Sequence, residues 1–279
     1  VDWKEREKEL SDLLNKHRRK DGYYDVLVPG SGGKDSRFVA HILKTKYKMN
    51  PLTCTWAPHA YTEIGWKNFQ SWINSGLDNI LITPDGKVHR KLTKLSFKNL
   101  LHPFQPFAIG QSVIPIKIAL EKKINLIVYG DNQAEVGVGG NLFSFNDKYR
   151  NILLQSYNKF EDIHLSGFSI KELEEEHKIS RKFLNLYIPA RQEEIEKNNI
   201  EAIKMPYFLN YNPQSNFYYA MEHTNFEVNP EGRSEGTYTK YSSLDDKIDG
   251  LHYYTWFIKT GRGRTTEDAG LEIRNKEDL

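Results

Sequence analysis

Cysteine is nearly absent from the 279-residue sequence, which contains only Cys54, and long apolar runs are missing altogether. A single thiol excludes disulfides within the chain and any metal site built from several of its own thiolates. No segment approaches the roughly 18 apolar residues that cross a bilayer, and the charged stretch VDWKEREKEL is unlike a signal peptide. We therefore expect a protein of the reducing cytoplasm that is neither exported nor inserted in a membrane.

An excess of charge of either sign is also lacking, since 39 Lys and Arg side chains stand against 37 Asp and Glu, for a formal net charge of +2. This balance gives no overall electrostatic reason to bind nucleic acid, so we expect no nucleic-acid partner. Aromatic residues, in contrast, make up 13% of the sequence and include 16 tyrosines, which is too many for a disordered chain. The length suits one large or two modest folded domains.

Short apolar runs alternate with amphipathic segments through the first half of the sequence. The apolar runs are typical of buried strands, and the amphipathic segments are typical of helices. Strands are predicted at 24–29, 51–57, 79–84 and 124–130, and helices at 2–19, 36–46, 62–76 and 109–123. A polar connection is expected between the third strand and the last of these helices. Such alternation predicts the α/β class, with a parallel sheet and right-handed crossovers.

The pattern changes near residue 145. Residues 169–178 are acidic and helical in character, and residues 205–236 are dense in aromatic, Asn and turn-forming residues. We therefore predict an N-terminal domain at 1–145 and an α-rich C-terminal subdomain at 146–279. No low-complexity linker separates the two parts, so this boundary is soft.

A glycine-rich stretch, VLVPGSGGKDSRF at 26–38, follows the first predicted strand and opens the first predicted crossover helix. Backbone N–H groups at such a helix start favour an anion. The glycine spacing does not fit the dinucleotide fingerprint G-x-G-x-x-G. It does not fit a Walker A loop either, because Asp35 follows Lys34 where that motif requires Ser or Thr.

Residues 31–36, Ser-Gly-Gly-Lys-Asp-Ser, match the motif of PP-loop ATP pyrophosphatases. The glycines allow the backbone to approach pyrophosphate, the hydroxyls donate hydrogen bonds, Lys34 supplies a catalytic cation and Asp35 is a catalytic Mg²⁺ ligand. The motif predicts a Rossmann-like open parallel sheet of the adenine-nucleotide alpha-hydrolase type, and cleavage of ATP to AMP and pyrophosphate. The predicted ATP-binding residues of the loop are Ser31, Gly32, Gly33, Lys34, Asp35 and Ser36.

A second polar cluster, YGDNQAEVGVGG at 129–140, follows the fourth predicted strand. Ligands of open parallel sheets bind at this carboxyl edge, so Asp131 and Glu135 are predicted Mg²⁺ ligands, Asp131 is also a catalytic candidate, and Gly130 is predicted to contact ATP. The alternative is that Asp131 caps a helix while Glu135 is solvated.

The second predicted strand ends at the same edge in TCTWAPHA. Thr55 and Trp56 can line an adenine pocket there, although Trp56 is equally suited to a place in the core. Cys54 lies within the strand, where a buried thiol acts as a small apolar side chain. This argues against sulfur transfer and leaves amide, amidine and related nitrogen chemistry as the better candidates.

Several stretches together carry a resemblance that extends over most of the chain. They are SGGKDS, TWAPHAYTEIGWKNFQSWINSGLDNILITPDGKVHRKL, HPFQPFAIGQ, YGDNQAE and YYTWFIKTGRGRTTEDAGLEIRN. These stretches resemble the N-acetyl sugar amidotransferases of surface-polysaccharide (lipopolysaccharide O-antigen) and flagellar-sugar biosynthesis, within the PP-loop superfamily. The resemblance implies an ATP- and Mg²⁺-dependent ligase that converts an acetamido to an acetamidino group. It also implies a glutaminase and a cyclase-like barrel as partners that supply ammonia.

The sequence departs from this family at its ends, and the role of two of its arginines stays open. Members of the family commonly carry the cysteine pairs of a zinc ribbon before the region that matches Val1, and they tend to continue past the segment that matches Ile273. Both features are absent here, so we expect trimming at both ends and no zinc within this chain. In GRGRTTEDA, Arg262 and Arg264 are candidates to bind the carboxylate of an acidic sugar or a nucleotide diphosphate, or they belong to a solvated turn. A PP-loop enzyme that modifies tRNA and a non-catalytic nucleotide-binding scaffold are the remaining alternatives.

Overall fold

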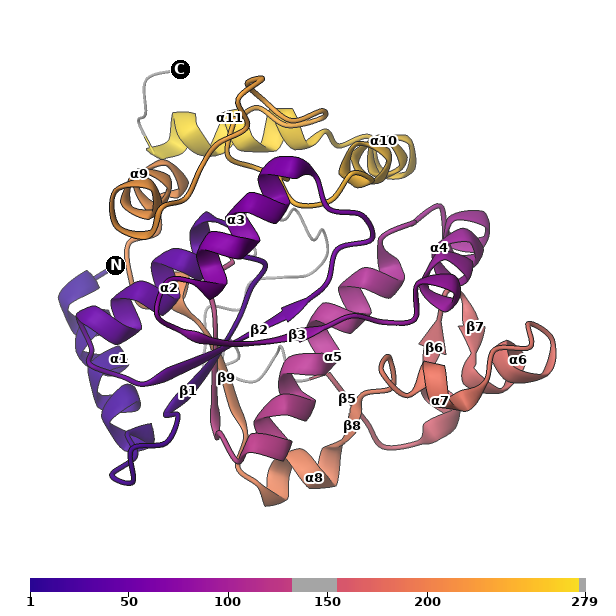
Figure 1. Cartoon of the computed structure of the whole chain (residues 1–279), viewed down its shortest axis with the longest axis horizontal. Coiled ribbons are helices and arrows are strands. Elements are labelled where there is room, and N and C mark those ends of the chain that lie inside the picture. Colours follow the sequence, from indigo (N-terminus) through magenta and orange to yellow (C-terminus); the bar gives the residue numbers. More distant parts are fainter. Residues whose placement is uncertain (132–154, 276–279) are drawn as a thin grey trace.

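A five-stranded parallel sheet forms the centre of the molecule in the computed structural model, which describes residues 1–131 and 155–275 (Figure 1). The strand order is β3-β2-β1-β4-β9, and each neighbouring pair is parallel. The bounds are β1 Val26–Pro29, β2 Pro51–Trp56, β3 Asp78–Ile82, β4 Leu126–Tyr129 and β9 Glu201–Lys204. The open parallel α/β fold predicted from the sequence is confirmed.

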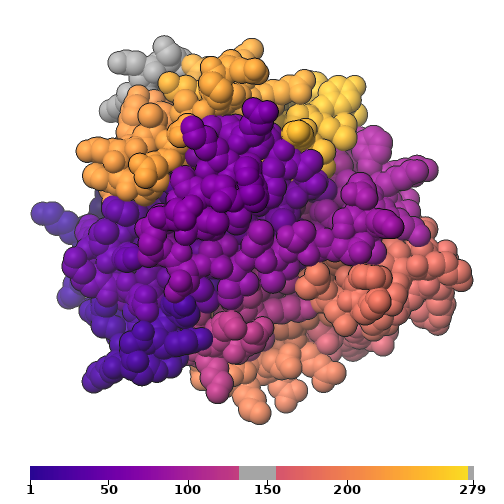
Figure 2. All heavy atoms as spheres, viewed as in Figure 1, coloured from indigo at the N-terminus to yellow at the C-terminus, as the bar shows by residue number. Residues whose placement is uncertain are grey.

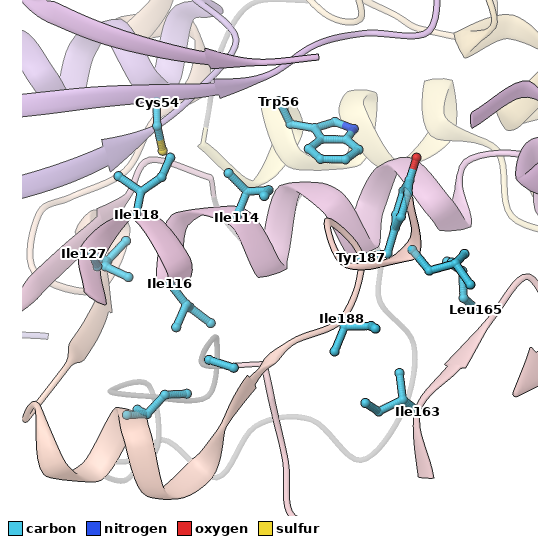
Figure 3. Packing of buried hydrophobic residues seen from close by; sticks show 14 of the residues in the cluster. Cys54, Trp56, Ile114, Ile116, Ile118, Ile127, Ile163, Leu165, Tyr187 and Ile188 are labelled. Carbon is cyan, nitrogen blue, oxygen red and sulfur yellow. The ribbon is translucent and has the colours of Figure 1, made fainter. Parts of the chain in front are cut away.

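Helices cover both faces of the sheet. On one face lie α1 (Trp3–His17), α2 (Lys34–Thr45) and α3 (Glu63–Ile73), and on the other lie α4 (Gly86–Leu100) and α5 (Gln105–Lys122). Strand side chains alternate between the two layers. In β1, Val26 and Val28 pack with α1 and α2, and Leu27 packs with α5. Figure 3 shows the α5 side, where Cys54, Ile114, Ile118 and Ile127 point toward one another.

The polar connection expected between residues 84 and 109 is instead largely helical, because it contains helix α4. Asp85 caps this helix, because its side chain accepts hydrogen bonds from the backbone N–H groups of Lys87 and Val88. Leu92 is fully buried on the face that packs against α5, and Val88 and Leu95 lie against the same cluster. The buried stripe is narrow and the remaining positions are largely basic or polar, so the segment is amphipathic but reads as polar overall.

The C-terminal half is rich in short helices, as predicted. They are α6 (Ile170–Glu175), α7 (Arg181–Leu184), α8 (Gln192–Lys197), α9 (Pro213–Thr224), α10 (Asp249–Thr260) and α11 (Arg264–Asn275). Two small sheets pair β5 (Ser156–Tyr157) with β8 (Ala190–Arg191) and β6 (His164–Leu165) with β7 (Phe168–Ser169).

Strand β9 belongs to this half but pairs with β4, so the central sheet crosses the boundary predicted near residue 145. The division into two domains stays a prediction. Helix α9 packs on α2, and the residues of α9–α11 form a continuous surface with α3 at the upper edge of the view (Figures 1 and 2). Within the described ranges, no helix has the length and apolar character needed to cross a membrane.

Candidate active site

The candidate site lies where the strand order reverses. From β1 the chain runs to β2 and β3 on one side, whereas β4 and β9 lie on the other, so the strand order reverses between β1 and β4. Gly130, directly after β4, lies against the first turn of α2, because a Cβ atom on Gly130 would lie 2.7 Å from the carbonyl oxygen of Asp35. The structure thus brings the 31–36 motif and Gly130–Asp131 together, as the sequence predicts.

A cavity of about 460 Å³ opens at this point, within the range of small-molecule sites. Its base is formed by residues 30–36 and by the ends of β2 and β4. Gln111 and Ser112 of α5 form one side. Residues 241–245, together with Tyr253 and Arg264, form a wall supplied by the C-terminal half.

The glycine loop has the geometry of an anion site. Gly32 has a φ of +89°, which favours glycine, and a Cβ atom there would lie 3.0 Å from Cβ of Trp72. Gly33 is the N-cap of α2, and no side chain caps this helix. The first N–H groups of α2 therefore lack a side-chain cap on the edge where the cavity opens, where they can bind a phosphate.

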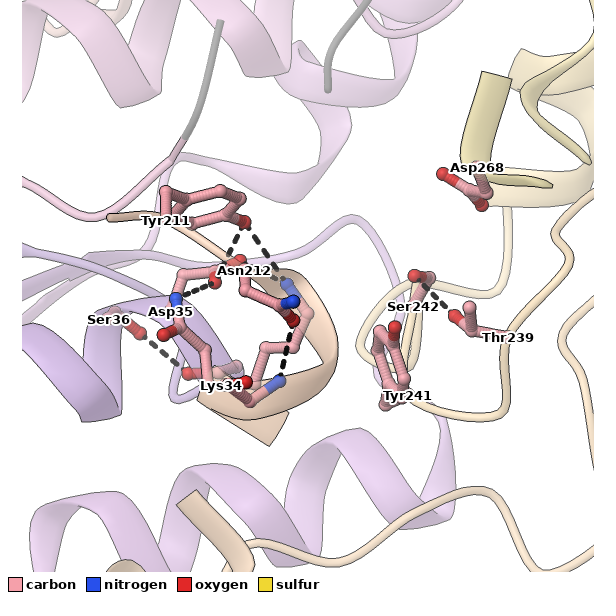
Figure 4. A network of polar contacts seen from close by, with 12 residues as sticks. Lys34, Asp35, Ser36, Tyr211, Asn212, Thr239, Tyr241, Ser242 and Asp268 are labelled. Carbon is pink, nitrogen blue, oxygen red and sulfur yellow. Dashed lines mark hydrogen bonds and ion pairs between the residues drawn. The ribbon is translucent and has the colours of Figure 1, made fainter. Parts of the chain in front are cut away.

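Lys34 and Asp35 form an ion pair in the cavity (Figure 4). Lys34 is only 5% exposed, and its Nζ lies 2.6 Å from Oδ2 of Asp35. The hydroxyl of Tyr211 donates to Oδ1 of Asp35 at 3.1 Å, and Asn216 of α9 lies 3.4 Å from the same oxygen. Residues near the start of α9 thus hold the Asp35 carboxylate in place.

A second lysine–aspartate pair lies at the end of the neighbouring strands. Lys204, the last residue of β9, is 5% exposed, and its Nζ lies 2.5 Å from Oδ2 of Asp131. Asp131 lines the cavity. The sequence motifs do not reveal Lys204, since its only signal is a lysine at the carboxyl end of a short strand.

Of the three predicted Mg²⁺ ligands, Asp35 and Asp131 line the same cavity. The third, Glu135, lies outside the described residues. No group of three or more His, Cys, Asp or Glu side chains in the described part of the chain is arranged to hold a metal ion. Two carboxylates beside a phosphate loop fit Mg²⁺, which takes one or two protein carboxylates and completes its shell with phosphate oxygens and water.

The remaining predicted residues are placed as follows. Trp56 lines the cavity and packs against Gly110 of α5, where a Cβ atom would lie 2.3 Å from the indole. Thr55 is buried, and its hydroxyl donates to the carbonyl of Gly30 at 2.7 Å, so it supports the loop. Arg264 lines the cavity, whereas Arg262 is exposed and lies outside the lining.

The wall carries carboxyl groups that no sequence motif reveals. Asp245 lines the cavity, and burial raises its pKa despite a hydrogen bond from Ser31. Burial, followed by the charges of Asp245 and Asp246, raises the pKa of Asp249 to about 8. Asp246 accepts a hydrogen bond from the backbone N–H of His59 at 2.7 Å. A raised pKa favours the protonated acid, so Asp245 repels a polyphosphate in the cavity less than a fully charged carboxylate would.

No family model and no curated protein matches the sequence. Among solved structures, the chain is similar to a predicted subunit of a tRNA methyltransferase from Methanocaldococcus jannaschii, with 16% identity over 86% of this chain and 89% of that chain and a TM-score of 0.37. It is similar to an NH₃-dependent NAD synthetase from Campylobacter jejuni, with 17% identity, 71% and 95% coverage and a TM-score of 0.39.

A third similar structure is the U34-tRNA thiolase NcsA from Methanococcus maripaludis with its [4Fe-4S] cluster, with 15% identity, 95% coverage of this chain, 79% of that chain and a TM-score of 0.39. Identities and TM-scores this low carry no argument about activity or substrate.

Proposed function

We propose that the protein is an ATP-dependent enzyme that splits ATP between its α and β phosphates. The observation that carries the proposal is the position of the 31–36 motif, at the reversal of strand order and at the base of a cavity of about 460 Å³. Backbone N–H groups of the loop and the Lys34 ammonium bind the pyrophosphate that leaves. The indole of Trp56 lines the same cavity and offers a surface for adenine.

Asp35 and Asp131 would hold Mg²⁺ beside the phosphates. The ion would neutralise phosphate charge. The protein's own task is to orient these carboxylates, and it does so through the contacts of Lys34 and Tyr211 with Asp35 and of Lys204 with Asp131.

The acceptor that we propose is the acetamido group of a sugar, on the basis of the family resemblance. The amide oxygen forms a bond to the α phosphorus while the bond to the β phosphate breaks, so pyrophosphate leaves. Ammonia then forms a bond to the imidate carbon, AMP leaves with the former amide oxygen, and an acetamidino group remains. The wall fits this role because Asp245, Ser243 and Tyr253 offer hydrogen bonds to sugar hydroxyls, and Arg264 can bind an acidic group.

In this proposal, ammonia comes from a glutaminase and a cyclase-like partner, and nucleic acid is not a substrate. The reaction belongs to surface-polysaccharide or flagellar-sugar biosynthesis.

The decisive experiment incubates the protein with ATP, Mg²⁺, ammonium and a panel of free and nucleotide-linked acetamido sugars. Exchange of oxygen for NH lowers the product mass by about 1 Da, and AMP and pyrophosphate form in equal amounts. A parallel incubation with bulk tRNA tests the alternative. AMP formation that depends on tRNA would replace the sugar proposal, and ATP binding without AMP formation with any acceptor would contradict both enzymatic readings.

A further inference from the structure

Arg37 is a fully buried cation one turn into α2, directly behind the glycine loop. In the described residues, no carboxylate lies within ion-pairing distance of its guanidinium. Burial lowers its pKa to about 10, so the group is charged at neutral pH. A buried charge without a counter-charge is strongly unfavourable unless hydrogen bonds satisfy it.

Backbone carbonyls from three distant segments satisfy this guanidinium. Its Nε donates to the carbonyl of Gly32 at 2.6 Å, and its two terminal nitrogens donate to the carbonyls of Thr224 and Asn68. One terminal nitrogen also reaches the hydroxyl of Ser71. Thr224 is the last residue of α9, where the helix dipole carries partial negative charge that favours a cation.

The contact with Gly32 determines how the loop presents its backbone. The C=O and N–H groups of a trans peptide point in opposite directions. Because the Gly32 carbonyl points to the buried Arg37, the N–H of Gly33 in the same peptide points away from it, and Gly33 lines the cavity. The φ of +89° at Gly32 favours glycine, and a Cβ atom there would lie 3.0 Å from Cβ of Trp72, so this loop conformation leaves no room for a side chain.

The same guanidinium joins the loop to the C-terminal half. Asn68 of α3 accepts from Arg37 through its carbonyl, and its side chain exchanges two hydrogen bonds with the backbone of Glu227, at 2.8 and 2.9 Å. Residues 224–227 lead into the segment whose residues 241–245 form the cavity wall. The loop, α3 and the chain that follows α9 therefore share one buried anchor.

We propose that Arg37 is a positioning residue of the phosphate site, which fixes the Gly32–Gly33 peptide with its N–H toward the bound anion and adds a positive charge behind the loop. It acts through the loop, since it is fully buried and does not line the cavity. This inference rests on the proposed function only in identifying the anion as a polyphosphate.

The test compares Arg37→Gln and Arg37→Lys with Ser71→Ala. The probes are calorimetric binding of inorganic pyrophosphate with Mg²⁺ and hydrogen exchange of residues 31–36 without ligand. Arg37→Gln is expected to weaken pyrophosphate binding by at least about 10-fold and to speed exchange in the loop, because hydrogen bonds to a charged group are lost. Arg37→Lys retains the positive charge but lacks the planar guanidinium. Its pyrophosphate affinity and its loop exchange rate are expected to lie between those of Arg37→Gln and the wild type.

Ser71→Ala is the matched control, since it removes a hydroxyl that contacts Arg37 without touching the loop. It is expected to lower the melting temperature but to keep pyrophosphate binding within about 2-fold. If residues 31–36 of Arg37→Gln exchange hydrogen at the same rate as in the wild type, the inference is overturned, whether or not the protein binds pyrophosphate. If Arg37→Gln does not fold, the same criterion applies to Arg37→Lys. Absence of pyrophosphate binding by the wild type would instead contradict the proposed function.

Discussion

The two sides of the cavity differ in how they are built. The loop at 30–36 is one short segment whose backbone N–H groups and Lys34 favour negative charge. The wall gathers residues 241–245, Tyr253 and Arg264 from separate turns of the chain, and burial raises the pKa of its Asp245. One side is suited to polyphosphate, and the other to polar groups and, at Arg264, to an acidic group. This asymmetry fits the proposed transfer of a nucleotide to an amide.

The strongest test of this asymmetry replaces one aspartate on each side with asparagine. Asp35→Asn is expected to lower kcat for AMP formation by about 100-fold or more, because it removes a fixed charge beside the phosphates. Asp245→Asn is expected to leave the affinity for ATP within about 2-fold, because burial already favours the protonated acid. Steady-state kinetics and ATP titration measure both. Equal losses of kcat and of ATP affinity in the two variants would contradict the distinction between the two sides of the cavity.

A second test concerns the contact between Gly130 and the first turn of α2. Gly130→Ala places a Cβ atom 2.7 Å from the Asp35 carbonyl oxygen, so the two segments must separate. We expect weaker ATP binding and a loss of about 1–3 kcal/mol in the free energy of unfolding. The control is Gly270→Ala, whose Cβ would meet only the flexible end of Arg274 at 3.4 Å. ATP binding of wild-type strength in Gly130→Ala would show that this contact is dispensable.

A third test separates the two arginines of GRGRTTEDA. Arg264 lines the cavity and pairs with Asp268 at 2.7 Å, whereas Arg262 is exposed outside it. Arg264→Met is expected to raise KM for an acidic acceptor by about 10-fold, because a charged hydrogen-bond donor is lost. Arg262→Met is expected to match the wild type. KM values are compared well below the melting temperature of each variant, and the reverse ranking would assign the role to Arg262.

A further test concerns the pH dependence of stability. The pKa of Asp249 is raised from 3.8 to about 8 by burial and by Asp245 and Asp246, with Arg264 opposing the shift. Between these values the folded protein holds a proton that the unfolded chain releases, so this group's contribution to stability is full below the lower value and is lost as pH rises toward the upper one. Asp249→Asn removes this loss.

The measurement is the melting temperature of both proteins across this pH range. The variant is expected to gain stability relative to the wild type as the pH rises. A difference that does not change with pH would mean that Asp249 does not titrate as described.

The parts that could be predicted from the sequence are those coded locally. The 31–36 motif, the strands on either side of β1 and the helices between them are each set by about ten consecutive residues. Strand β9 could not be predicted, because EAIK contains two charged residues and becomes a strand only through pairing with β4. Helix α4 left a signal in its Asp85 cap and its spaced apolar residues.

The site residues follow the same rule. Lys34 and Asp35 belong to a contiguous motif, whereas Lys204, Asp245 and Arg37 acquire their roles from segments far away in sequence. Arg37 resembles any polar helical position until Thr224 and Asn68 are placed around it. Such contacts depend on tertiary packing, which the spacing of residues in one segment does not encode.

Cys54 is a natural reporter of motion at the cavity, because its thiol can be probed without introducing a new cysteine. Its thiol lines the base of the cavity at 2% exposure, its burial raises its pKa, and the sequence contains no second thiol to react in its place. A thiol reagent therefore reaches this side chain only when the packing around the end of β2 opens. The rate of thiol modification reports how often this packing opens. A nucleotide bound in the cavity is expected to lower that rate in proportion to its occupancy.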